Sequence, residues 1–167
     1  MAVSDLIRTK RAVRQFTDEP LPEEAIRSIL NAGRRAQSSK NTQPWHFVAI
    51  RDRATLRQLS QCGAYAGHLA RAPFAVALIA STDDSFDLGQ AAAYMQLAAW
   101  ELGIGSCIAS MWEHEKTKEI LGVPHDQLFD VAISFGYPLP GREQSHPPKP
   151  NGRKPFDEVV FWERWGG

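Results

Sequence analysis

The sequence predicts a single α+β domain in which a sheet is layered with helices. Segments of helical periodicity alternate with short apolar runs of strand length along the 167 residues, as in domains that stack helices on a sheet. A chain of this length buries roughly 70% of the surface that its unfolded form exposes. Its 43% hydrophobic and 23% charged residues are a globular mix, which excludes collagen-like, disordered and disulfide-scaffold classes.

The first half of the chain predicts three helices and two strands. A short helix over Ala2–Thr9 precedes a turn that ends at Pro22, and Pro22 suits the first position of a second helix. That helix has one apolar face, formed by Ala25, Ile26, Ile29, Leu30 and Gly33. A polar loop, a strand, a short helix and a buried apolar strand follow, at Gln37–Pro44, Trp45–Ile50, Ala54–Gln61 and Phe74–Ala80.

The second half predicts an apolar helix, two strands and a shorter helix. Leu88–Leu102 is hydrophobic on most of its surface, as expected of a core or interface helix, and Gly103 ends it. A strand over Gly105–Ala109, a helix over Glu115–Leu121 and a buried strand over Phe129–Phe135 come next. After a Pro-rich loop, the tail from Phe156 to Trp165 is rich in aromatic residues.

Charge and cysteine usage limit the classes of partner and compartment. Nineteen basic and nineteen acidic residues give a net charge of zero, which argues against nucleic acid as a partner and permits self-association. Cys62 and Cys107 form no CxxC pair, so we expect two buried, reduced thiols in a cytoplasmic protein. No apolar run is long enough for a signal peptide or a membrane span.

Two segments are candidates for an anion and ring site. Lys10, Arg11 and Arg14 lie within five residues, and an anion between such cations would relieve their repulsion; the alternative is a solvated basic patch. The loop from Gln37 to Gln43 carries seven consecutive hydrogen-bonding side chains before Pro44 and Trp45. Such a loop can line a heteroaromatic ring, and the alternative is an ordinary polar loop.

The remaining motifs mainly exclude kinds of site. The glycines of Leu102–Ser106 follow a helix and precede a strand, so they predict a tight turn and not a dinucleotide fingerprint. Two cations, Arg153 and Lys154, follow the Pro/Gly segment. Alone they predict a solvated turn, and they would join the first basic cluster only if the tail folds back beside it. The five histidines are scattered and no G-x-S-x-G elbow exists, so we expect no metal site and chemistry supplied by a cofactor.

Over essentially the whole chain the sequence resembles the FMN-dependent nitroreductase family. The resemblance rests on the basic pattern from Lys10 to Phe16 and on the segment Gln37–Trp45, which corresponds to the family's PSSxNxQPW. Further matches are LGIGSC at Leu102–Cys107, ILGVP at Ile120–Pro124, GYP at Gly136–Pro138 and RKP at Arg153–Pro155. The resemblance implies a three-layer α/β/α sandwich with a mixed, mostly antiparallel central sheet.

The resemblance also implies roles for individual residues. Lys10, Arg11, Ala12 and Arg14 would hold the FMN phosphate and ribityl chain, and Arg153, with Lys154, would close on the same phosphate. Ser38, Ser39 and Asn41 would line the flavin from the partner subunit of a homodimer. The backbone N–H of Ser110, or of Ala109, would point at flavin N5.

Some positions depart from the family's pattern. Lys10 replaces a usual Arg and so loses the forked contact, Ala12 replaces a usual Ser, and Gln37 replaces a usual Pro. The family often offers an Asn or Gln to the pyrimidine edge of the flavin; here Tyr65 or a neighbour within Gly63–His68 falls at that place. The sequence leaves this contact unassigned.

The implied activity is two-electron transfer from NAD(P)H, through flavin N5, to an electron-poor acceptor such as a nitroaromatic or a quinone. Three alternatives stay open: a specialised relative with the same fold, of the flavin-destroying synthase, dehalogenase or azoline dehydrogenase type; a sensor that binds flavin without turnover; and an interaction module with a basic patch. The physiological acceptor and the choice between NADH and NADPH are not specified by the sequence.

Overall fold

The computed structural model describes residues 2–81, 85–143 and 152–165. Its centre is a sheet of four antiparallel strands in the order β1-β2-β4-β3. The strands are β1 (Trp45–Ile50), β2 (Phe74–Ala80), β3 (Gly105–Ser110) and β4 (Leu128–Gly136). An isolated bridge between Ala12 and Ser106 adds one parallel pairing beside β3. The expected mixed, mostly antiparallel sheet is therefore antiparallel in all four strands, with this bridge as its parallel part.

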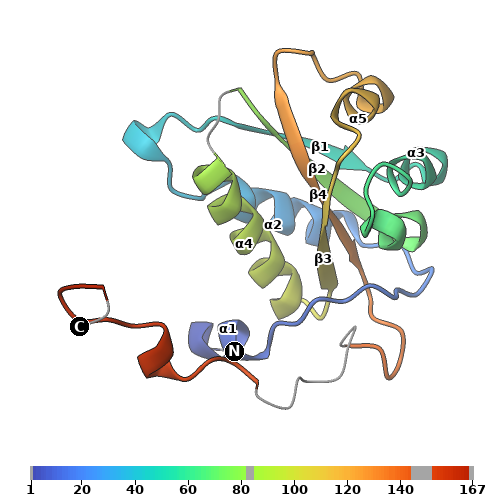
Figure 1. Ribbon diagram of the computed structural model, residues 1–167. Coiled ribbons are helices and arrows are strands. Elements are labelled where there is room, and N and C mark those ends of the chain that lie inside the picture. The colour runs from blue at the N-terminus through green and yellow to red at the C-terminus, as the bar shows by residue number, and fades with distance from the viewer. Residues whose placement is uncertain (1, 82–84, 144–151, 166–167) are drawn as a thin grey trace.

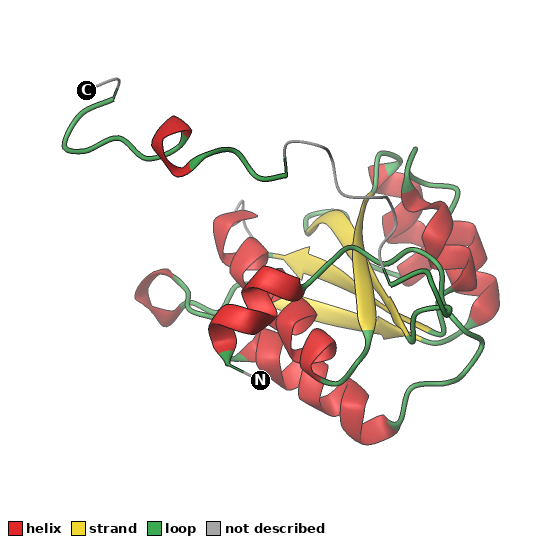
Figure 2. Ribbon diagram, turned by 90° about the horizontal axis from the view of Figure 1, so that it is seen from below, coloured by secondary structure: helices red, strands yellow, loops and turns green. Residues whose placement is uncertain are grey.

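Helices cover both faces of the sheet, which confirms the three-layer prediction. Figure 1 shows α2 and α4 on one side of the strands and α3 and α5 on the other. Figure 2 shows the sheet between these two helical layers. The helices are α1 (Val3–Thr9), α2 (Glu23–Arg34), α3 (Arg53–Leu59), α4 (Ser85–Glu101) and α5 (His114–Leu121), with short 3-10 helices at Ser39–Asn41, Ala66–Arg71 and Phe156–Glu158.

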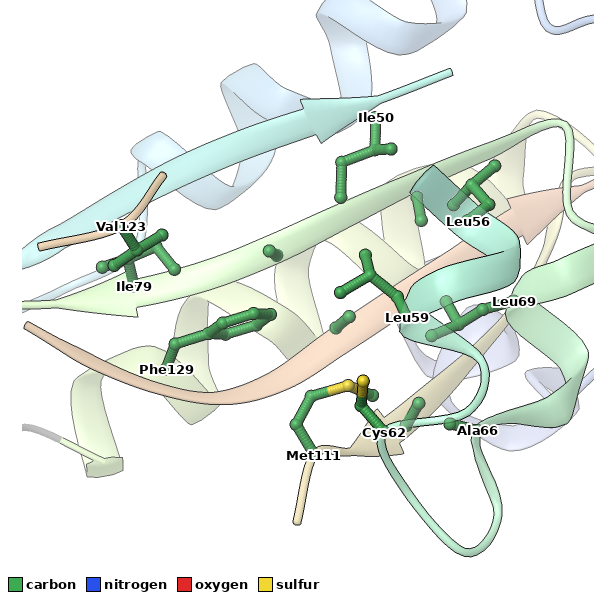
Figure 3. Packing of buried hydrophobic residues seen from close by; sticks show 14 residues of the cluster. Ile50, Leu56, Leu59, Cys62, Ala66, Leu69, Ile79, Met111, Val123 and Phe129 are labelled. Atoms are coloured by element: carbon green, nitrogen blue, oxygen red, sulfur yellow. The ribbon is translucent and has the colours of Figure 1, made fainter. Parts of the chain in front are cut away.

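Each face of the sheet has its own apolar core. On the α2/α4 face, Ile29 of α2 and Met95 of α4 pack against strand side chains that include Phe74 and Phe135. On the other face, Leu56 and Leu59 of α3 join a cluster that also contains Cys62, Ala66, Leu69, Met111 and Phe129 (Figure 3). The strand β2 lies between β1 and β4 and all seven of its residues are buried, as its continuous apolar sequence predicts.

Several predicted boundaries shift by a few residues. Pro22 is the N-cap of α2 and not its first residue, because its ψ of 144° is extended. The helix α4 begins at Ser85 and ends at Glu101, before the turn at Gly103 with a φ of 74°. The 3-10 helix Ala66–Arg71 was not predicted, since its six residues are too few to establish a hydrophobic period.

Candidate functional site

The basic segment after α1 lies along the outer edge of β3. The Trp100 indole at the end of α4 donates a hydrogen bond to the Thr9 hydroxyl at 3.1 Å, which fixes the end of α1. Val13 then donates its backbone N–H to the Ser106 carbonyl at 3.0 Å. The approach is close because Gly105 has no side chain: an added Cβ would lie 2.6 Å from the Cβ of buried Val13. Local backbone pairing thus positions the cations on either side of Val13.

Lys10 and Arg14 are half-buried cations without a carboxylate partner among the described residues. Some exposed cations do have a carboxylate partner, as Arg8 does with Asp5 at 3.0 Å. Burial lowers the pKa of Lys10, which is the sign of a cation that has lost water without gaining a counter-ion. Both cations lower the pKa of the Cys107 thiol against the larger effect of burial, so they face the same part of β3.

Arg11 and Ala12 differ from their neighbours. The Arg11 guanidinium turns back and donates to the backbone carbonyls of Arg8 at 2.8 Å and Lys10 at 2.9 Å, an arrangement that caps the end of α1. Ala12 forms the bridge to Ser106. Of the predicted phosphate residues in this segment, the structure brings Lys10 and Arg14 together and gives Arg11 a capping contact.

A buried histidine lies behind this edge. His68 is 7% exposed, and its Nδ1 lies 2.8 Å from the Ser134 hydroxyl, which donates to the Cys107 carbonyl at 3.3 Å. Its Nε2 is buried and has no hydrogen-bond partner in the described part of the chain. Burial first, and the charge of Arg14 second, lower the pKa of His68 to about 4. The sequence alone gives no sign of this contact, because its partner Ser134 lies 66 positions away.

The open edge of β3 offers one of the two backbone N–H groups that were predicted to face a ligand. The Ser106 carbonyl accepts from Val13, on the side away from β4. Backbone groups of a strand alternate in direction, so Ser110 faces this open side and Ala109 faces β4. The Ser110 carbonyl accordingly lies against Gly63, where an added Cβ would be 2.1 Å from the carbonyl oxygen. The geometry favours Ser110 over Ala109.

Two exposed aromatic side chains flank the end of β3. Tyr65 is 81% exposed and Trp112 is 61% exposed, and their rings meet edge to face with centroids 6.4 Å apart. The Trp112 backbone N–H donates to the Cys62 carbonyl at 2.8 Å, which ties the two loops together. Figure 3 shows the sulfur atoms of Cys62 and Met111 side by side. Trp112 was not predicted as a site residue, because its place beside Tyr65 depends on this tertiary contact.

The polar loop has a defined set of hydrogen bonds, and it lies at the opposite end of α4. Lys40, Asn41 and Gln43 adopt positive φ angles, and the Ser38 hydroxyl accepts from the Gln43 N–H at 2.9 Å. The buried Asp87 in the first turn of α4 accepts from the Ser39 N–H at 3.2 Å.

The separation of the polar loop from the basic segment follows from the length of α4. The loop contacts α4 at Asp87, and the basic segment contacts it at Trp100. Thirteen residues of helix span about 20 Å at 1.5 Å per residue. Within one chain, Ser38, Ser39 and Asn41 therefore do not meet Lys10 and Arg14.

The two cations of the tail are also apart from the first cluster. Arg153 and Lys154 are exposed, and the hydrogen bonds of the described segment 152–165 join residues of that segment to one another. Figure 2 shows this segment extending away from the sheet and helices. Its aromatic side chains are largely uncovered, with Trp162 at 72% and Trp165 at 90% exposure.

No helix in the described ranges is long and apolar enough to cross a bilayer. The same ranges contain no group of three or more His, Cys, Asp or Glu side chains placed to bind a metal ion.

Comparison with known proteins agrees with the motifs. A sequence model described as the nitroreductase family matches residues 7–62 and 57–137. A protein of Archaeoglobus fulgidus described as an NADH dehydrogenase/NAD(P)H nitroreductase is 32% identical over 145 residues, covering 80% of this chain and 83% of its own length. An FMN-dependent nitroreductase from Clostridium difficile R20291 has a TM-score of 0.81 at 28% identity, with 96% of this chain and 98% of that chain covered.

A more distant structure shows how widely the fold is shared. An NADPH:FMN oxidoreductase from Vibrio harveyi, solved as a complex with NAD+, has a TM-score of 0.85 at 21% identity and covers 98% of this chain and 78% of its own. The family model spans well over half of the residues. The expected resemblance is confirmed, and the chain belongs to the nitroreductase family.

Proposed function

We propose that this protein is an FMN-dependent oxidoreductase that moves two electrons from NAD(P)H to an electron-poor acceptor such as a nitroaromatic or a quinone. The observation that carries the proposal is the pair Lys10 and Arg14, two half-buried cations with no carboxylate partner in the described chain. Such a pair is costly unless an anion binds between the two charges. The relatives named as nitroreductases supply the class of reaction.

The residues of the site suit FMN. Lys10 and Arg14 match a phosphate, and the outward N–H of Ser110 matches a hydrogen-bond acceptor on the ring. Bound FMN supplies the redox chemistry, because it accepts two electrons from NAD(P)H and passes them to the acceptor. The chain itself binds the phosphate, orients the ring and places the acceptor; no side-chain acid or base is required.

The exposed ring pair indicates where the acceptor rests. Tyr65 and Trp112 lie beside Ser110 and present aromatic surface next to the proposed ring position. Flat, electron-poor molecules stack favourably on such side chains. We therefore place the acceptor, and the nicotinamide in its turn, between the flavin and this pair.

We further propose a homodimer with the flavin sites at its interface. The polar loop and the basic segment are about 20 Å apart in one chain, so a second copy would have to bring Ser38, Ser39 and Asn41 to the cations. The exposed Tyr94 on α4 and the uncovered tail aromatics are surfaces that a partner would bury. In such a dimer Arg153 and Lys154 would reach the phosphate from the tail.

We place the protein in the cytoplasm, in a single domain over residues 1–167. Cys62 and Cys107 are free thiols with buried side chains, as expected of a reducing compartment. Burial raises the pKa of both thiols. They therefore remain protonated and have a packing role.

The experiment compares Arg14→Ala with Arg8→Ala, which removes an exposed cation already paired with Asp5. Purified wild type is expected to be yellow and to release FMN on denaturation. Loss of one charged contact weakens FMN binding by about tenfold or more in Arg14→Ala, with turnover per bound flavin unchanged. Full flavin occupancy in that variant would refute the phosphate role. Anaerobic NAD(P)H oxidation with and without an acceptor separates an enzyme from a flavin-binding sensor.

A further inference from the structure

The polar loop has a backbone conformation that its own residues do not favour. Lys40, Asn41 and Gln43 have φ angles of 50°, 57° and 50°, in the left-handed region that is costly for residues other than glycine. Inside the loop, the Ser38 hydroxyl accepts from the Gln43 N–H at 2.9 Å. Such a backbone persists where the surrounding structure holds it in place, so contacts from outside the loop are of interest.

These outside contacts come from two side chains at the start of α4. The Asp87 carboxylate accepts from the Ser39 N–H at 3.2 Å through one oxygen, and from the Gln90 amide at 3.2 Å through the other. The same Gln90 amide also donates to the Gln37 carbonyl at 3.3 Å. Two backbone groups of the loop are thus bound to a single turn of helix.

The charge of Asp87 strengthens this attachment. The residue is 6% exposed, and no Lys or Arg pairs with it in the described part of the chain. A buried carboxylate is costly without partners, and here its partners are N–H groups and the positive end of the helix in whose first turn it lies. Hydrogen bonds to an ionised acceptor are stronger than neutral ones. The loop is therefore held to α4 by a charge-assisted contact.

The attachment determines which groups of the loop stay available to a ligand. The Ser39 N–H is occupied by Asp87. The Ser38 hydroxyl already accepts from Gln43, and its own hydrogen has no acceptor among the described residues. The fixed loop therefore offers the Ser38 hydroxyl as a donor, and not the Ser39 backbone.

We propose that Asp87 is a positioning residue that, through the Ser39 N–H, holds the polar loop in the conformation in which it lines the flavin ring. The inference rests on the proposed function, since it needs a flavin site to which the loop contributes. Asp87 itself touches no ligand. Because the loop would serve the ring, the effect of Asp87 is common to FMN and riboflavin, whereas the effect of Arg14 is confined to FMN.

The test measures dissociation constants of FMN and of riboflavin, which lacks the phosphate, by quenching of flavin fluorescence. Asp87→Ala is expected to weaken binding of both flavins by about tenfold, and Asp87→Asn, whose amide oxygen can still accept from Ser39, by less. The matched control is Asp52→Ala, which removes another carboxylate at a helix start, one that accepts from the Thr55 N–H at 2.7 Å. The control should lower the Tm and leave both dissociation constants unchanged. A loss confined to FMN, or the same loss in Asp52→Ala, would overturn the proposal.

A second variant keeps the test valid if Asp87→Ala does not fold. Gln90→Ala removes the donor to the Gln37 carbonyl and should weaken both flavins by the same factor, about threefold, so that the preference for FMN over riboflavin is kept. Arg14→Ala should reduce that preference. If wild type binds neither flavin, the proposed function fails together with this inference. If wild type binds flavin and the Asp87 and Gln90 variants bind both flavins equally well, only the inference fails.

Discussion

Replacing Gly105 with alanine should separate the basic segment from the sheet. The new Cβ would lie 2.6 Å from Val13 Cβ and 2.7 and 2.9 Å from its two methyl carbons, where carbon atoms normally stay about 3.5–4.0 Å apart. Val13 is fully buried and cannot rotate away. Its backbone must therefore move by about 1 Å, which stretches the 3.0 Å hydrogen bond to Ser106.

The expected cost has two parts. Overpacking in a dense core costs about 1–3 kcal/mol, and a weakened backbone hydrogen bond adds about 1 kcal/mol. A total of roughly 2–4 kcal/mol corresponds to a Tm lower by roughly 5–15 °C for a chain of this size. Arg14 is the next residue after Val13, so FMN affinity should also fall, while riboflavin affinity changes little.

The assay is thermal unfolding followed by circular dichroism, together with flavin titration. Gly89→Ala is the matched control: Gly89 lies in α4, and an added Cβ there meets nothing within 4 Å. That substitution should stabilise the protein by about 0.5–1 kcal/mol. A Gly105→Ala variant with unchanged Tm and unchanged FMN affinity would refute the claim that this contact positions the cations.

Three more outcomes follow from single contacts. Asp87→Ala removes the carboxylate that accepts from the polar loop at 3.2 Å, so trypsin should cleave after Lys40 faster than in wild type, whereas Asp5→Ala should leave that rate unchanged. Tyr65→Ala should raise KM for flat aromatic acceptors several-fold, because about 0.5–1.5 kcal/mol of stacking is lost. Ferricyanide reduction should be unchanged, and Tyr65→Phe should behave like wild type. Equal KM values in all three proteins would exclude ring stacking. The pKa of His68 is lowered from 6.5 to about 4. Between these values the unfolded chain binds the extra proton, so the free energy of unfolding should fall as pH decreases, by at most about 3 kcal/mol. Urea titrations should show a smaller decrease in His68→Gln.

Much of the fold could be predicted because its elements have strong local signatures. The continuous apolar run Phe74–Ala80 predicts a buried strand, and it is the most completely buried strand of the sheet. The apolar face of α2 repeats at helical spacing, and Ile26, Ile29 and Gly33 are buried as expected. Such periodicity predicts the structure well because the side of a helix or strand that is buried is also the side that carries apolar residues.

The site could be predicted only in part, because its geometry depends on contacts between distant segments. The sequence groups Lys10, Arg11 and Arg14, but the backbone contacts of Arg11 appear only when α1 has an end to cap. Likewise, His68 Nδ1 meets the hydroxyl of Ser134, which lies 66 positions away in the sequence. Strand alternation, which distinguishes Ser110 from Ala109, requires knowledge of which side β4 occupies.

The placement of the polar loop and the cations at opposite ends of α4 has a genetic consequence in the proposed dimer. Each pocket would draw its cations from one chain and its loop from the other. A chain damaged in the loop and a chain damaged at Arg14 would each bind FMN weakly in both pockets of a homodimer. When the two are mixed, the hybrid would combine both defects in one pocket and leave the other pocket intact, so strong FMN binding would reappear from two weakly binding parents.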